Sequence, residues 1–144
     1  MKRHSEIPLV PYNFARCFND SCTKAGQCLH RMAATNDTAQ HPTIPIINPR
    51  CIPEDTGACK YFKSTQKMRV AWGIQHLLDT VPHKDARSIK AQLIAHFGKT
   101  KYYRIYREEN FLTPEEQEYI RRLFHKYGVE QEPAFESYSD EYRW

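Results

Sequence analysis

The chain has 144 residues, 40% of them hydrophobic and 12% aromatic, which is typical of one globular domain or of a domain with a small added module. Its formal net charge of +4 is too modest to indicate a class of partner by itself. No apolar run approaches the ~20 residues that cross a bilayer, which excludes a transmembrane helix. The first residues carry positive charge without an apolar stretch after them, so we expect no signal peptide and a cytoplasmic protein whose thiols stay reduced.

Charge is distributed unevenly along the chain. Residues 1–59 carry a net charge of +1, residues 60–128 carry 14 basic and seven acidic side chains, and residues 129–144 carry one basic and five acidic side chains. Together with the position of the cysteines, this distribution predicts three parts. They are a Cys-rich, metal-binding segment over 1–62, a basic helical bundle over 63–128 and an acidic, aromatic tail over 129–144.

The first part of the chain is predicted to be mostly irregular. A short helix is expected over about 24–34, whereas the prolines and scattered polar residues over 33–57 exclude a long helix. Ile44, Ile46 and Ile47 within this stretch can still dock on a core as a short edge strand.

The middle part has the apolar spacing of helices. Helices are predicted over about 64–80, 84–97 and 100–109, because apolar residues recur there three or four positions apart. Pro82 breaks the chain between the first two helices, and Gly98 is suited to the position just after the second. Each helix is expected to bury its apolar stripe in a bundle.

The clearest helix start in the chain belongs to a fourth helix. Thr113 is suited to the N-cap, Pro114 occupies the first helical position and Glu116 completes a capping box. This helix is predicted to run to Tyr127. The residues after it, 130–144, alternate acidic with aromatic side chains without a regular period, so we interpret them as a flexible or docking tail.

All five cysteines lie within the first 59 residues, which indicates a local function for these thiols. We predict a Zn²⁺ site, because four thiolates in tetrahedral geometry suit this ion and would order a segment with little apolar material of its own. The predicted ligands are Cys17, Cys22, Cys28 and Cys59. Cys51 is left without a role, and His30 and His41 are substitute ligands. The alternatives to zinc are an iron–sulfur cluster, a disulfide and ordinary buried thiols.

Basic residues are concentrated over 84–107. A helix, a short turn with Gly98 and a second helix suggest a helix-turn-helix element, whose second helix can enter the major groove of DNA. The candidate contacts to DNA or RNA are Lys84, Arg87, Lys90, Lys99, Lys101, Tyr102, Arg104 and Arg107. The register fits this motif poorly, because Leu93 or Ile94 is bulky where a small residue is expected and Arg104 falls at an apolar position. A solvated basic face or a surface that binds another protein is therefore the alternative.

Several short stretches of the chain form a recognisable set. They are Cys17, Cys22 and Cys28-Leu29, then Cys59-Lys60-Tyr61-Phe62, Phe97-Gly98, Tyr102-Tyr103-Arg104, and Leu112-Thr113-Pro114-Glu115-Glu116-Gln117 leading to Ile120 and Gly128. This set resembles an uncharacterised family of short bacterial, Cys-containing proteins of the domain-of-unknown-function type. The resemblance spans most of residues 12–128. It implies no established activity and assigns no catalytic or binding residue, but it supports treating the Cys-rich and helical parts as one unit.

These observations predict a mainly α-helical protein in which an irregular, Cys-rich, metal-stabilised N-terminal segment packs on a bundle of about four helices. The predicted function is that of a non-enzymatic regulatory or adaptor protein with a structural metal site, and nucleic-acid binding through 84–107 is its most concrete form. The alternatives are a protein-binding module without nucleic-acid activity and an iron–sulfur or redox protein. No catalytic residue is predicted, because paired catalytic carboxylates, a phosphate-binding glycine loop and a nucleophile motif are all missing from the sequence.

Overall fold

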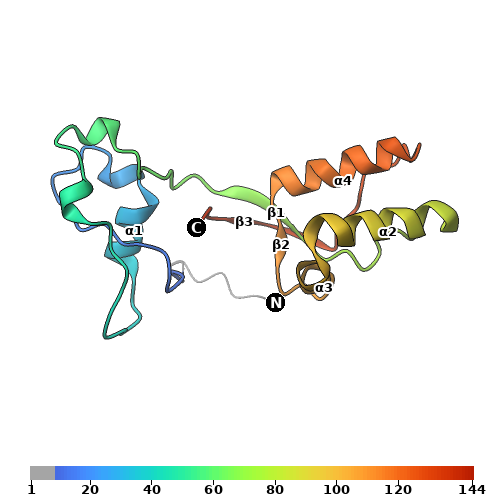
Figure 1. Ribbon diagram of the computed structural model, residues 1–144, viewed down its shortest axis with the longest axis horizontal. Coiled ribbons are helices and arrows are strands. Elements are labelled where there is room, and N and C mark those ends of the chain that lie inside the picture. The colour runs from blue at the N-terminus through green and yellow to red at the C-terminus, as the bar shows by residue number, and fades with distance from the viewer. Residues whose placement is uncertain (1–8) are drawn as a thin grey trace. The chain divides into compact units, whose positions relative to one another are not determined.

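The computed structural model describes residues 9–144. Contacts divide the described chain into two compact units. Residues 9–66 with 142–144 form the first, which we call the cysteine unit, and residues 67–141 form the second, which we call the sheet unit. Figure 1 shows the helices and strands of both. The division falls close to the predicted end of the Cys-rich segment, and residues 129–141 are part of the sheet unit.

Within the described residues, the sheet unit has three antiparallel strands and three helices. The strands are β1 (Met68–Trp72), β2 (Phe111–Leu112) and β3 (Ser137–Glu141), and the helices are α2 (His83–Phe97), α3 (Lys99–Tyr106) and α4 (Pro114–Lys126). The strand order is β2-β1-β3, so the first strand in the chain is the central one. The register places Ala71 of β1 opposite both Leu112 of β2 and Tyr138 of β3.

The helix predicted over 64–80 is wrong. This stretch contains β1 and then a series of turns. The apolar spacing that suggested a helix arises because Val70 in the strand and Ile74 in the turn after it are both buried. Gly73 ends the strand with a φ of 79°, and a Cβ at this position would collide with the side chain of Glu136. Glycine is therefore required here for its backbone conformation and for its small size.

The helices predicted over 84–97, over 100–109 and after Thr113 are confirmed as α2, α3 and α4, although α3 ends early at Tyr106. The capping box is present. Thr113 Oγ1 accepts a hydrogen bond from the Glu116 amide at 3.3 Å, and Glu116 Oε2 accepts one from the Thr113 amide at 2.9 Å. None of the helices in residues 9–144 combines the length and the apolar character needed to span a bilayer.

The sheet unit has one continuous apolar core. Its buried members are Ala71, Ile74, Leu77, Val81, Ile89, Leu93, Tyr102, Ile105, Leu112, Ile120, Leu123 and Phe124. These residues come from two strands, all three helices and the turns after β1. Helix α4 packs on β1 and β2, and α2 packs on both α3 and α4. The helices therefore share their core with the sheet.

Residues 137–141 form a strand where the sequence suggested a flexible or docking tail. β3 pairs with the whole length of β1, from Met68 opposite Glu141 to Trp72 opposite Ser137. The indole Nε1 of Trp72 also donates a hydrogen bond to Ser139 Oγ at 2.8 Å. The pairing gives this stretch a structure that its local sequence pattern does not reveal.

The predicted fold class, mainly α with a helical bundle, is wrong. The described residues combine four α-helices, one in the cysteine unit and three in the sheet unit, with a three-stranded antiparallel sheet. The sheet unit is thus an α+β fold. Among these residues the Cys-rich part is a compact unit by itself, and it shows no ready-made metal-binding group.

The cysteine unit is built from short elements. They are the 3₁₀ turns η1 (Ala25–Gln27), η2 (Pro49–Cys51) and η3 (Thr56–Ala58) and the helix α1 (Leu29–Asn36). The helix predicted over 24–34 is divided at Cys28, whose backbone is extended with φ −105° and ψ 126°. The expected isoleucine strand is reduced to a single parallel bridge between Ile46 and Arg16.

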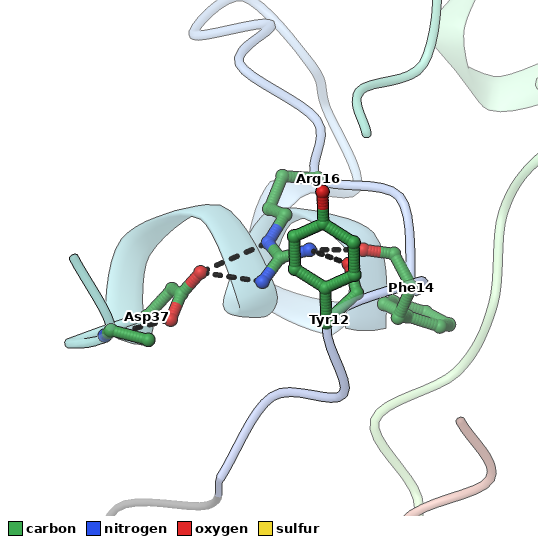
Figure 2. Close-up of polar contacts among 5 residues, drawn as sticks. Tyr12, Phe14, Arg16 and Asp37 are labelled. Atoms are coloured by element: carbon green, nitrogen blue, oxygen red, sulfur yellow. Dashed lines mark hydrogen bonds and ion pairs between the residues drawn. The ribbon is translucent and has the colours of Figure 1, made fainter. Parts of the chain in front are cut away.

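A buried arginine organises the cysteine unit. Arg16 is fully buried, and its Nε and Nη2 donate to Asp37 Oδ2 at 3.0 and 2.6 Å. Its Nη1 donates to the carbonyl oxygens of Tyr12 and Phe14 at 2.7 and 2.8 Å, as Figure 2 shows. The backbone amide of Ala39 and the Arg16 guanidinium hold the pKa of Asp37 below its usual value. These bonds tie the segment before Arg16 to the end of α1 and leave the buried charge fully paired.

Candidate metal centre

Four of the five cysteines line one cavity in the cysteine unit. They are the four predicted ligands, Cys17, Cys22, Cys28 and Cys59. The cavity has a volume of about 20 Å³, which is room for roughly one water molecule. Cys28 is buried and the other three are partly buried, whereas Cys51 is exposed and does not line the cavity. The fold therefore separates four thiols from the fifth.

Cys17 is held beside α1 by backbone hydrogen bonds. Its amide donates to the carbonyl oxygen of His30 at 3.0 Å, and its own carbonyl oxygen accepts a bond from Arg31 Nη1 at 3.3 Å. The Nδ1 of His30 donates in turn to the carbonyl oxygen of Ala15 at 2.6 Å. The loop that carries Cys17 is thus fixed on both sides of the cysteine.

Cys28 lies at the start of α1, where a second segment of the chain pairs with it. Cys28 forms an antiparallel bridge with Ser64, and the amide of Leu29 donates to the carbonyl oxygen of Lys63 at 2.6 Å. The chain that leaves Cys59 must therefore return to α1 within a few residues. This pairing brings a distant cysteine to the three local ones.

Two threonines join the segment of Cys22 to the segment of Cys59. The amide of Thr23 donates to Thr56 Oγ1 at 3.0 Å, and the two hydroxyl oxygens are also 3.0 Å apart. The carbonyl oxygen of Thr56 accepts a bond from the amide of Cys59 at 3.3 Å. No sulfur takes part in these bonds, so they bring the two segments together without a metal.

Two of the residues that line the cavity are basic. Lys24 and Arg31 line it, and no carboxylate is among the described residues that do so. Cations beside the cavity would partly compensate the two net negative charges of a zinc ion with four thiolates. Lys24 Nζ lies 4.5 Å from the centroid of the Phe62 ring, a cation–π contact that holds this ammonium group in place.

The thiols themselves are not gathered around a common centre. Within residues 9–144, no group of three or more His, Cys, Asp or Glu side chains is arranged so that it could hold a metal ion. All five cysteines are free thiols. His30 lines the cavity with Nδ1 engaged by Ala15, whereas His41 contacts Tyr12 edge-on, with 4.8 Å between ring centroids, outside the cavity. Metal binding therefore requires the four thiol side chains to rotate toward one point.

The residues predicted to bind nucleic acid lie on and after α2 and α3. Six are exposed, namely Lys84, Arg87, Lys90, Lys99, Arg104 and Arg107, whereas Lys101 is half-buried and Tyr102 is buried. Lys101 pairs with Glu116 and Arg107 pairs with Glu109. The other five basic side chains have no ion pair with any residue that the structure describes. These five side chains are each open to solvent.

Two details differ from the predicted helix-turn-helix element. Tyr102 is 4% exposed and belongs to the apolar core, so its ring cannot stack on a base, and this burial raises the pKa of its hydroxyl. Gly98 alone separates α2 from α3, whereas a helix-turn-helix has a turn of three or four residues. The two helices carry basic residues without the geometry of that motif.

The match to known proteins is at the level of a family. A model of a family of unknown function, DUF6078, matches residues 1–144. The chain belongs to this family. The resemblance to an uncharacterised family that the short motifs indicated is thereby confirmed. No curated protein and no solved structure matches the chain.

Sequence reasoning missed the residues that position the thiols. Thr23 and Thr56 are far apart in the chain, and no local pattern links them. Arg16 gives no signal either, because arginine is seldom fully buried. Lys24 and Arg31 could have been found, since each is a basic residue within three positions of a predicted ligand.

Proposed function

We propose that the four cysteines lining the cavity hold one Zn²⁺ ion, and that the chain is a non-enzymatic regulatory or adaptor protein stabilised by this ion. The observation that carries the proposal is the distribution of the thiols. Four line one small cavity, and Cys51 lies outside it. Hydrogen bonds from Thr23 and Cys17 to other segments of the same chain bring their segments to this cavity before any metal is bound.

Zinc fits this cavity better than the alternative uses of the thiols. A volume of about 20 Å³ suits one ion, whereas an iron–sulfur cluster contains several iron and sulfide atoms and needs more room. The described cysteines are all free, which does not favour a disulfide framework. Zinc accepts four soft thiolates in tetrahedral geometry and needs no redox partner.

The proposed ion has a structural role. The cysteine unit buries few apolar side chains, namely those of Val10, Cys28, Leu29, Ala33 and Ile47. Zinc in finger peptides contributes about 10–16 kcal/mol of apparent binding free energy, which is enough to order such a segment. Four protein ligands also fill the tetrahedral shell, so they leave no open position for a substrate. This supports a non-enzymatic protein.

Elemental analysis of protein purified without oxygen tests the proposal. We expect one zinc per chain and a colourless solution. A brown protein that contains iron would support the iron–sulfur alternative. Protein without any metal, but with the amides of the cysteine unit protected from hydrogen exchange, would contradict metal stabilisation.

Serine substitutions provide the matched comparison. Cys59→Ser is expected to abolish stoichiometric zinc, because three thiolates and a hydroxyl bind the ion much more weakly. Cys51→Ser makes the same chemical change outside the cavity and is expected to retain one zinc per chain. Equal loss of zinc from both variants would contradict the ligand set.

A second candidate function is nucleic-acid binding through α2 and α3, and it rests on a different observation. Five exposed basic side chains there have no ion pair with the described residues. They are Lys84, Arg87, Lys90, Lys99 and Arg104. Such side chains neutralise phosphates and supply affinity without reading sequence. The proposed contacts are therefore to the nucleic-acid backbone.

Titration of fluorescent duplex DNA and single-stranded RNA at several salt concentrations tests this candidate. Affinity is expected to fall steeply with salt, because phosphate contacts release counterions. Arg87→Glu on α2 is expected to weaken binding, whereas Lys126→Glu makes a similar charge reversal on α4 and is expected to have a smaller effect. Binding that is insensitive to salt, or equal effects of the two reversals, would contradict the proposed surface.

A further inference from the structure

A groove adjoins the metal cavity within the cysteine unit. Its volume of about 500 Å³ is within the range of ligand pockets. The groove and the cavity share Asn19, Ile47, Ile52 and Thr56 in their walls. One side comes from the residues that follow Cys17 and the other from the Pro-rich loop. No residue of the sheet unit is needed to form it.

Apolar side chains line this groove while remaining exposed. Phe18 is 53% exposed and Ile46 is 47% exposed, and Pro49 and Ile52 extend the same lining. Exposed apolar residues that are scattered singly are ordinary in soluble proteins. Two large ones on a shared concave surface instead indicate a contact surface for another molecule.

The backbone at Ile46 offers hydrogen-bonding groups toward the outside. The amide of Arg16 donates to the carbonyl oxygen of Pro45 at 3.0 Å, and the amide of Ile47 donates to that of Arg16 at 2.9 Å. Successive peptide groups of extended chain point in opposite directions, so the amide and carbonyl of Ile46 point away from Arg16. Neither has a backbone partner within residues 9–144. An extended peptide can pair with such groups by strand addition.

The rim of the groove is acidic. Asp20 and Glu54 line it, and the described lining contains no lysine, arginine or histidine. Asp20 forms an ion pair with Arg31 at 2.5 Å, whereas Glu54 has no ion pair among the described residues. Charge complementarity therefore favours a basic partner over an acidic one.

We propose that this groove binds an extended segment of another protein in which apolar residues alternate along the chain and lysine or arginine residues flank them. The apolar side chains would contact Phe18 and Ile46, the backbone would pair with Ile46, and the basic residues would lie near Glu54. This interaction goes beyond metal binding. The groove lining contains none of the four proposed zinc ligands, but the inference rests on the proposed function in one respect, since the ion is expected to keep the cysteine unit folded.

Fluorescence anisotropy with a defined peptide tests the proposal on the full chain. The probe is fluorescein-labelled Lys-Arg-Ser-Val-Thr-Ile-Thr-Val-Ser-Arg-Lys, and the matched probe carries Glu in place of every Lys and Arg. We expect saturable binding of the basic peptide and about tenfold weaker binding of the acidic one. The difference is expected to decrease at high salt, because salt screens exposed charges.

Substitutions locate the binding surface. At high salt, where an added carboxylate attracts the lysine and arginine residues of the peptide least, Ile46→Glu is expected to weaken binding about tenfold, because it places a charge against apolar side chains. Leu9→Glu makes a similar change at a residue that is 83% exposed and outside the groove, and it is expected to leave binding unchanged. Zinc content measured on the same samples separates failure of the groove from failure of the metal centre.

Three results would overturn the proposal. The first is the absence of saturable binding by the wild-type chain, and the second is equal binding by wild type and Ile46→Glu. The third is self-association, detected by sedimentation, that Ile46→Glu abolishes while the peptide does not compete with it. That result would assign the groove to a second copy of the chain.

Discussion

The two units of the chain are stabilised in different ways. The sheet unit has a continuous apolar cluster to which two strands and three helices contribute. In the cysteine unit the largest fully buried side chain is Arg16, which pairs with Asp37. The cysteine unit has little apolar material, so its stability depends on specific polar bonds and, in our proposal, on a metal ion. The sheet unit is stabilised by apolar packing instead.

Removal of the proposed zinc is expected to have the largest effect on stability, because it should destabilise the cysteine unit and leave the sheet unit folded. The binding free energy of about 10–16 kcal/mol for structural zinc in finger peptides is as large as the whole stability of a typical domain, about 5–15 kcal/mol. After treatment with a strong chelator, amide hydrogen exchange should become fast over 9–66 and stay unchanged over 67–141. Equal acceleration in both ranges would show that the units are not stabilised separately.

Leu93→Ala is expected to act on the sheet unit alone. Leu93 is fully buried in the apolar cluster, so the cavity left by truncation should lower the free energy of unfolding by about 2–5 kcal/mol. Trp72 belongs to the sheet unit and Trp144 to the cysteine unit. Urea unfolding of a Trp144→Phe background, followed by Trp72 fluorescence, measures the effect. Zinc content should not change.

Thr113→Ala is expected to lower the free energy of unfolding of the sheet unit by about 1 kcal/mol, because the N-cap of α4 loses its hydrogen bond to the Glu116 amide. The same urea experiment measures this change. Ser88→Ala alters an exposed residue inside α2 and should be neutral or slightly stabilising. A loss for Ser88→Ala as large as that for Thr113→Ala would rule out the cap as the cause.

Acid is expected to destabilise the cysteine unit through Asp37. The Ala39 amide and the Arg16 guanidinium lower the pKa of Asp37, so its ionised form stabilises the folded state. This contribution is complete above the ordinary aspartate pKa of about 4 and is lost as the pH falls through the lower folded-state value. Trp144 fluorescence during acid titration measures it, and Asp37→Asn should remove that part of the pH dependence.

The smallest effect on stability is expected from His76, and its dependence on pH is opposite to that of Asp37. A hydrogen bond at 2.8 Å to Glu136 raises the pKa of His76, so its charged form stabilises the sheet unit below the ordinary value of 6.5. The contribution is lost as the pH rises through the folded-state pKa. Titration of the His76 ring by NMR measures this pKa, and Glu136→Gln should return it toward the ordinary value. An unchanged pKa in that variant would contradict the assigned cause.

Local signals in the sequence were sufficient where the structure depends on neighbouring residues. The capping box of Thr113 and Glu116 and the glycine after α2 define helix ends within a few positions, and both are present. β1 was missed because its partners, β2 and β3, lie far along the chain. The spacing of Val70 and Ile74 fits a helix and a strand with a turn equally well.

The candidate metal centre was likewise predictable only in part. The cysteine spacing led to the four thiols that line one cavity, but whether they bind zinc stays a prediction. The bond between Thr23 and Thr56 joins residues that are remote in sequence, so it could not be foreseen. Arg16 is a buried charge whose partners become apparent only once the chain is folded.

The central place of β1 in the sheet sets the order in which the sheet unit can be completed during synthesis. β2 covers only Ala71 and Trp72, whereas β3, which is made much later, pairs with the strand from Met68 onward. Pairing between such distant residues slows folding. Until β3 has left the ribosome, the open edge of β1 can join the same edge of another nascent chain. Truncation before Ser137 thus removes the partner of a central strand.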